Sequence, residues 1–150
     1  MAGTVTTVLP YIDEHSVVVR VDDPGRVWEA LGERIGRLWR VPDIPARILR
    51  AEPAVRAGEV LHAGSTIPGF AIVRSEPTRE LVMEGSHRFS SYSLTFRLVS
   101  DGVNTTLSAE TRAAFPGASG RIYRGLVIGS RGHLVLVRGF LRAVRDRAQG

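Results

Sequence analysis

The sequence contains no cysteine and no lysine, so all 20 of its basic residues are arginines. Without cysteine the chain has no disulfide, no thiolate nucleophile and no sulfur-ligated metal site. No apolar run approaches the roughly 20 residues of a membrane-spanning helix, and the segment from Met1 to Asp13 lacks the basic and apolar regions of a secretory signal. We therefore expect a cytoplasmic protein with no membrane span.

The positive charge does not follow the pattern of a nucleic-acid-binding protein. The formal net charge is +5, and the arginines are spread from Arg20 to Arg147 without a dense block or interleaved aromatic residues. Proteins that bind nucleic acid gather basic residues on one patch, where they contact phosphates. We therefore expect most of the arginines to form a solvated surface, with no nucleic-acid partner.

The length of 150 residues suits one domain. The apolar fraction of 43% and the charged fraction of 23% are those of an ordinary globular chain. Threonine and valine alternate irregularly in the first residues until Pro10 interrupts them, which favours an extended arm over residues 1–13. Residues 14–150 are then expected to form a single domain.

The domain is expected to begin with a strand followed by a helix. The run from His15 to Val21 is short and β-branched, and it ends at Asp22-Asp23-Pro24, which combines an acidic cap with a first-turn proline. Apolar residues then recur at helical spacing: Val27, Trp28, Leu31 and Ile35. The helix should end near Gly36, because Pro42 and Pro45 prevent a continuous helix. We expect a second short helix there.

Between Ile48 and Phe115 the pattern changes to short apolar runs divided by turn signals, which predicts an antiparallel meander of five or six strands. The turn signals are Ala57-Gly58, Pro68-Gly69, Pro77-Thr78, Ser90-Ser91 and Asp101-Gly102. Taking the last pair as a two-residue turn sets Phe96 opposite Leu107 and Leu94 opposite Ala109. The apolar side chains of both strands then share one face of the sheet.

The opposite face of this hairpin is predicted to be wet. It takes Ser93, Thr95, Arg97, Thr106, Ser108 and Glu110. Glu110 and Arg112 alternate on the last strand and could be taken for a catalytic pair, but this register assigns both to the wet face. A slip of one residue would instead carry both into the interior.

After Pro116-Gly117 the sequence predicts one helix to the end of the chain, with Ser119 as a plausible cap and a length of about 28 residues, or about 40 Å. A helical projection puts one set of side chains on an apolar arc: Ile122, Leu126, His133, Val137, Phe140 and Val144. Arginines occupy the opposite arc. Gly125, Gly129, Gly132 and Gly139 share one flank, which indicates either close packing against a strand or space left open for a ligand.

The predicted order of elements is a strand, two short helices, a meander of strands and one long helix. This order predicts an α+β fold. The same order, with the stretch from Gly69-Phe70 through LVMEGSHRFSSYSLTF to AETRAAFPG and the closing helix, resembles the START/Bet v 1-like superfamily, also called SRPBCC. The resemblance covers the chain from about residue 14 onward. It implies a helix-grip fold, in which a curved antiparallel sheet wraps around the long C-terminal helix and leaves an internal cavity.

The resemblance also implies a function, since members of this superfamily include lipid and hormone carriers and aromatic polyketide cyclases. We expect the cavity to bind a small apolar or aromatic organic molecule, such as a lipid or a polyketide. The residues expected to line it are Phe70, Met83, Tyr92, Leu94, Phe96, Thr111, Tyr123, Leu126, Ser130, His133 and Val137.

Two other functions stay open. An enzyme of the cyclase or dehydratase type would use the same cavity, with His133 as general acid/base and Tyr123 or Thr111 donating to an enolate oxygen. A histidine on an apolar arc is equally often a hydrogen-bonded core residue. A module that binds a protein partner would instead have a cavity filled by its own side chains.

No motif indicates a metal or another cofactor. The four histidines, His15, His62, His87 and His133, show no metal-ligand spacing, and no nucleotide-binding or metalloprotease motif occurs. His87 and Arg88 lie where one strand turns into the next, and we expect a solvated turn there, although they could also border the cavity mouth.

Overall fold

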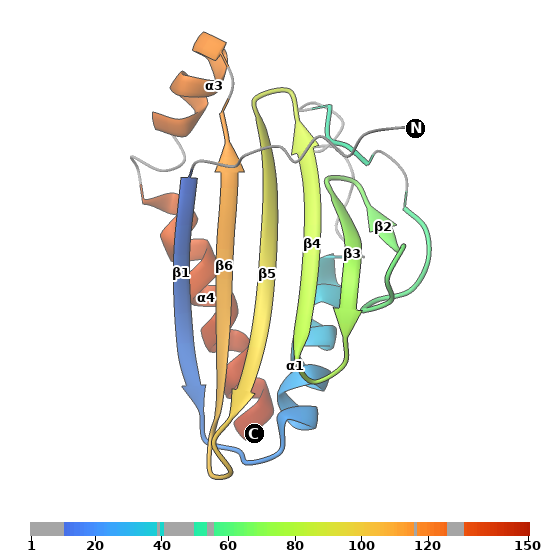
Figure 1. Cartoon of the computed structure of the whole chain (residues 1–150), viewed down its shortest axis with the longest axis vertical. Helices are drawn as coiled ribbons and strands as arrows, with labels where there is room; N and C mark the ends of the chain where they lie inside the picture. Colours follow the sequence, from blue (N-terminus) through green and yellow to red (C-terminus); the bar gives the residue numbers. More distant parts are fainter. Residues whose placement is uncertain (1–10, 39, 41–49, 54–55, 116, 126–130) are drawn as a thin grey trace.

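A six-stranded antiparallel sheet, in the order β1-β6-β5-β4-β3-β2, runs the length of the molecule (Figure 1). The computed structural model describes residues 11–38, 40, 50–53, 56–115, 117–125 and 131–150. The strands are β1 (Tyr11–Val19), β2 (Thr66–Ile67), β3 (Phe70–Glu76), β4 (Glu80–His87), β5 (Ser90–Ser100) and β6 (Thr105–Ala114). The helices are α1 (Pro24–Leu38), α3 (Gly117–Arg124) and α4 (Gly132–Gln149).

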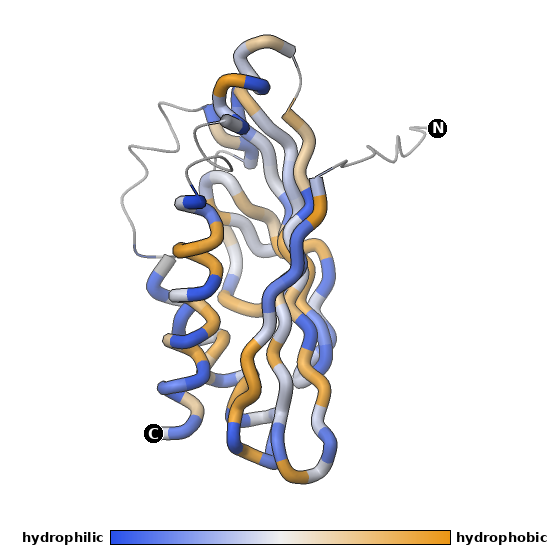
Figure 2. The backbone as a smooth tube through the Cα atoms, turned by 90° about the vertical axis from the view of Figure 1, so that its left-hand side faces the viewer, coloured by the Kyte–Doolittle hydropathy of each residue, from blue (hydrophilic) through white to orange (hydrophobic). Residues whose placement is uncertain are grey.

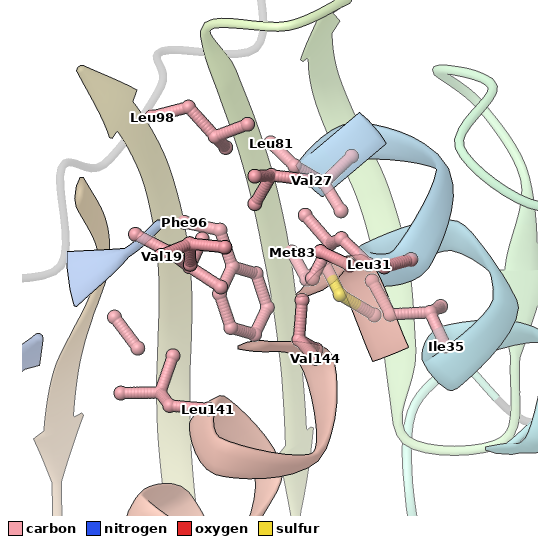
Figure 3. Packing of buried hydrophobic residues seen from close by; sticks show 14 of the residues in the cluster. Val19, Val27, Leu31, Ile35, Leu81, Met83, Phe96, Leu98, Leu141 and Val144 are labelled. Carbon is pink, nitrogen blue, oxygen red and sulfur yellow. The ribbon is translucent and has the colours of Figure 1, made fainter. Parts of the chain in front are cut away.

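The helices α1 and α4 lie side by side and pack on the same face of the sheet (Figures 1 and 2). The hydrophobic core lies between the sheet and these two helices and holds buried side chains from all three. Among them are Val19, Leu31, Met83, Phe96 and Val144 (Figure 3). This arrangement confirms the α+β class and the curved antiparallel sheet that holds a C-terminal helix. No helix in the described part of the chain is long and apolar enough to cross a membrane.

Strand β1 begins at Tyr11, four residues before the predicted start at His15, and pairs with β6 along its whole length. Its side chains alternate, so that Ile12 and Val18 are exposed while Tyr11, Asp13 and His15 turn to the side of the helices. Residues 1–10 of the predicted arm lie outside the described residues. The early start adds two polar side chains, Tyr11 and Asp13, to the inner face of the sheet.

Helix α1 begins at Pro24, as predicted. The Asp23 side chain caps it by accepting a 2.8 Å hydrogen bond from the Gly25 backbone N–H. The predicted apolar face is confirmed, because Val27, Leu31 and Ile35 are fully buried. The second short helix, expected after Gly36, falls largely on residues outside those described.

The β5–β6 hairpin differs from the predicted register by two residues. Its turn is centred on Gly102-Val103, because the Asp101 backbone N–H donates to Asn104 O at 3.0 Å. The Asp101 carboxylate also accepts from the backbone N–H groups of Val103 and Asn104. Phe96 therefore lies opposite Ala109 and Leu94 opposite Thr111. A shift of two residues leaves each side chain on its own face. The predicted wet face is nevertheless not wet throughout, because Thr95 is 6% exposed and Ser93 lines a cavity described below.

The outer face carries a ladder of ion pairs across four strands. Arg74 of β3 contacts Glu80 of β4, and Arg97 of β5 contacts Glu80 at 2.9 Å. Arg112 donates from Nε to Glu110 Oε1 at 2.8 Å, and this hydrogen bond holds the pKa of Glu110 below its usual range. Glu110 and Arg112 are thus confirmed on the wet face.

The helical part after β6 is divided, so the prediction of one helix of about 28 residues is wrong. Arg131 has left-handed backbone angles, with φ of 59°, and α4 starts at the next residue. Helix α3 begins at Gly117, ahead of the expected cap Ser119. Ile122 is exposed instead of facing the core, because α3 does not continue the axis of α4 (Figure 1).

Candidate functional site

In the part of the chain that the structure describes, two cavities lie between the sheet and the helices. The first has a volume of about 350 Å³ and lies among β5, β6, α3 and the start of α4. The second has a volume of about 630 Å³ and lies between the C-terminal half of α1 and α4, over β4 and β5. Both are lined by Phe70, Leu94 and Val137, so the two cavities adjoin.

Of the eleven residues expected to line a cavity, the structure describes nine, and each of these nine lines one of the two cavities. Those at the first cavity are Phe70, Tyr92, Leu94, Thr111, Tyr123, His133 and Val137. Met83 and Phe96 line the second. Leu126 and Ser130 lie outside the described residues. The alternation of the strands and the helical projection therefore found these nine residues, although others also line the two cavities.

Aromatic rings close one end of the first cavity. The ring of Tyr123 stacks on Phe89 at a centroid distance of 5.3 Å and meets His87 edge-on at 4.9 Å. His87 Nδ1 accepts from the Phe89 backbone N–H, and His87 Nε2 lies 3.1 Å from Ser90 Oγ. Burial lowers the pKa of His87, which favours its neutral form.

His87 is therefore not in a solvated turn, as we expected, but in the cavity wall. The turn between β4 and β5 falls on Arg88-Phe89 and not on Ser90-Ser91, because His87 pairs with Ser90 as the last rung of the ladder. The other possibility raised by the sequence, that His87 borders the cavity, is the one that the structure supports.

Tyr92 is fixed by an unusually close approach of two backbone segments. Its hydroxyl donates to the carbonyl of Gly69 at 2.6 Å, and Gly69 itself has a positive φ of 94°. The carbonyl of Gly69 lies directly over Gly85 of β4, where an added Cβ would overlap it. Burial raises the pKa of Tyr92 to about 12, so the phenol stays protonated as a donor.

A polar cluster of Tyr11, Asp13, His15, Thr111 and His133 lies where β1, β6 and α4 meet. Tyr11 donates to Asp13 Oδ2 at 2.6 Å, and the Nε2 atoms of His133 and His15 lie 3.2 Å and 3.8 Å from the same oxygen. The Asp13 and His133 side chains are 13% and 19% exposed. Desolvation, followed by the hydrogen bond to Asp13, raises the pKa of Tyr11 to about 12.

Four buried atoms of this polar cluster have no hydrogen-bond partner among the described residues: Asp13 Oδ1, His15 Nε2, Thr111 Oγ1 and His133 Nε2. Buried polar groups are normally satisfied, so a group of four is unusual. Thr111 and His133 also line the first cavity. The described residues hold no group of histidine, aspartate and glutamate side chains arranged for a metal ion.

Sequence reasoning found Thr111 and His133 but missed Tyr11, Asp13 and His15. These three residues alternate with exposed ones and continue into Val17 and Val19, which is the two-residue period of a strand. The signal was present, but Tyr11 and Asp13 were assigned to the extended arm, and the strand was started at His15.

No family model and no curated protein matches this sequence. Solved structures match it over nearly the whole chain. The Zhui aromatase/cyclase from Streptomyces sp. R1128 is 16% identical, with a TM-score of 0.58 and coverage of 93% of each chain. Ara h 8.0201 is 11% identical, with a TM-score of 0.60, and 92% of this chain matches 97% of that one.

The Mll3558 protein from Rhizobium loti is 17% identical, with a TM-score of 0.59, and 91% of this chain matches 96% of that one. At these identities the likeness concerns the fold alone. It confirms the helix-grip fold that the sequence resemblance implied.

Proposed function

We propose that this protein binds a small apolar or aromatic organic molecule in the two adjoining cavities. The observation that carries the proposal is their combined shape and lining. Each volume falls in the range of about 300–1,000 Å³ that is typical of small-molecule sites, and the shared wall is made of Phe70, Leu94 and Val137. The module that only binds a protein partner is less well supported, because its own side chains would fill this space.

The lining suggests how such a molecule would lie. Phe70 and Tyr92, whose ring centroids are 5.2 Å apart, offer an aromatic wall, and Tyr123 closes one end. Thr111 and His133 line the first cavity, and the buried Thr111 Oγ1 has no hydrogen-bond partner among the described residues. A hydroxyl or carbonyl group of the bound molecule that reached this hydroxyl would orient the molecule. Leu126 and Ser130 stay in the proposed lining set on sequence grounds.

Replacing Leu94 with tryptophan should block binding, because this side chain borders both cavities and the larger ring would occupy the shared space. The probe is the neutral dye N-phenyl-1-naphthylamine, whose fluorescence rises in apolar surroundings. We expect its affinity to fall by about tenfold or more, equivalent to about 1.4 kcal/mol.

The matched control is Val99→Trp, which adds the same ring to the outer face of the same strand. This variant should bind the dye like the unaltered protein. Equal affinities for the two variants, or no dye binding by the unaltered protein, would speak against a ligand-binding cavity.

A second candidate function is that of a cyclase or dehydratase, and the contact between His133 and Asp13 favours it. A carboxylate 3.2 Å from the imidazole at a cavity wall can orient the ring for proton transfer. Burial raises the pKa of Tyr123, which keeps its hydroxyl available to donate to an enolate oxygen. Thr111 offers a second donor.

A simple diketone tests this activity. His133 would take a methyl proton from 2,6-heptanedione, the resulting enolate carbon would bond to the far carbonyl carbon, and loss of water would give 3-methylcyclohex-2-enone. We expect His133→Leu to lower the rate by about 100-fold or more while dye binding is retained. Turnover that is absent, or equal in both proteins, would leave binding as the only function.

A further inference from the structure

Two arginines stand at the mouth of the second cavity. Arg34 and Arg37 are three residues apart on α1, so they share one face of the helix, and both line the cavity. Arg34 is half-buried with its guanidinium 6.0 Å from the centre of the Phe140 ring, whereas Arg37 is exposed. The rest of the lining is apolar except for backbone at Gly139.

Neither guanidinium has a carboxylate partner among the described residues. The acidic neighbour Glu33 is already engaged by Arg147, at 2.7 Å and 3.1 Å. On the outer face of the sheet the situation is the reverse, because Arg74, Arg97 and Arg112 all contact glutamates. Within the described part of the chain, the positive charge at this mouth thus has no acidic partner.

The α4 side of the same mouth is open and apolar. Val135 and Leu136 are 71% and 75% exposed, although both line the cavity. An added Cβ at Gly139 would meet no atom within 4 Å. The glycine flank predicted from the sequence therefore faces open space at this position and does not serve close packing.

The positive charge at the mouth and the apolar lining behind it together indicate which kind of ligand the second cavity can bind. We infer that the second cavity takes an amphiphile with one carboxylate, whose oxygens are bound by Arg34 and Arg37 while its apolar chain extends towards Leu94 and Val137. The guanidinium group is the side chain best suited to bind a carboxylate through paired hydrogen bonds. The inference rests on the proposed function and names the ligand class within it.

The test compares decanoate with 1-decanol, which have the same chain length but differ in charge, by calorimetric titration at about pH 8, where a carboxylic acid is ionised. Decanoate should bind about tenfold or more tightly than decanol, since charge-assisted hydrogen bonds are the stronger kind. The double variant Arg34→Gln/Arg37→Gln should lose this preference and keep its affinity for decanol.

A matched control removes two positive charges elsewhere. Arg138→Gln/Arg142→Gln changes exposed residues of α4 that line neither cavity, and it should keep the preference for decanoate. The inference fails, and the proposed function stands, if both probes bind equally or if the control loses the preference as well. If decanol, decanoate and the neutral dye all fail to bind, the proposed function fails too.

Discussion

Replacing Phe96 with aspartate should abolish the cooperative unfolding transition of this protein. Phe96 is 2% exposed and lies in the hydrophobic core (Figure 3). Its ring stacks on Phe140 of α4 at a centroid distance of 5.4 Å. Burying an unpaired carboxylate costs several kcal/mol, and the ring contacts are lost as well. The total stability of a domain is only about 5–15 kcal/mol. Urea denaturation followed by circular dichroism measures the effect.

The matched control is Val99→Asp on the outer face of the same strand, where Val99 is 67% exposed. Its free energy of unfolding should stay within about 0.5 kcal/mol of the unaltered protein. Arg97 would be a poor control, because an aspartate there would face Glu80 and Glu110, its present partners. Similar losses from Phe96→Asp and Val99→Asp would mean that the two faces of the sheet are wrongly assigned.

Replacing Gly85 with alanine should destabilise the protein by about 2 kcal/mol or more. The added Cβ would overlap the carbonyl oxygen of Gly69, which is backbone and cannot rotate away. The turn between β2 and β3 would have to move, and the hydrogen bond from Tyr92 to that carbonyl would be lost. Thermal and urea unfolding of the variant measure the cost.

The matched control is Gly139→Ala, for which the expected change in stability has the opposite sign. Gly139 is inside α4, and the Cβ there meets open space. Alanine is favoured over glycine in a helix interior by about 1 kcal/mol, so Gly139→Ala should stabilise the protein. A Gly85→Ala variant as stable as the unaltered protein would contradict the close approach of the two backbones.

The faces of the elements were predictable from the sequence because they depend only on periodicity. Leu31 and Ile35 of α1, and Leu94 and Phe96 of β5, lie on the inner side as their spacing indicated. The exact register of the β5–β6 hairpin could not be predicted in this way, because it depends on which residues form the turn. Asp101 accepts hydrogen bonds from two backbone N–H groups, and this moves the turn by one residue.

The polar cluster was harder to predict, because its members come from three separate elements. Asp13 and Thr111 become neighbours only when β1 pairs with β6, and α4 then brings His133 to Asp13. The break before α4 also had no periodic signal. In the sequence the apolar residues before and after it keep a helical spacing. Among the described residues, α3 ends at Arg124 and the left-handed backbone of Arg131 precedes α4.

Mapping the dye by NMR tests the central claim most directly, since it shows where a small molecule enters. On titration with N-phenyl-1-naphthylamine, the backbone amide signals of Tyr92, Leu94 and Val137 should shift and saturate together, because these residues line the two cavities. The signals of Val99 and Arg112, which lie on the outer face, should stay in place. Shifts confined to the outer face, or no shifts at a saturating concentration, would contradict an internal binding site.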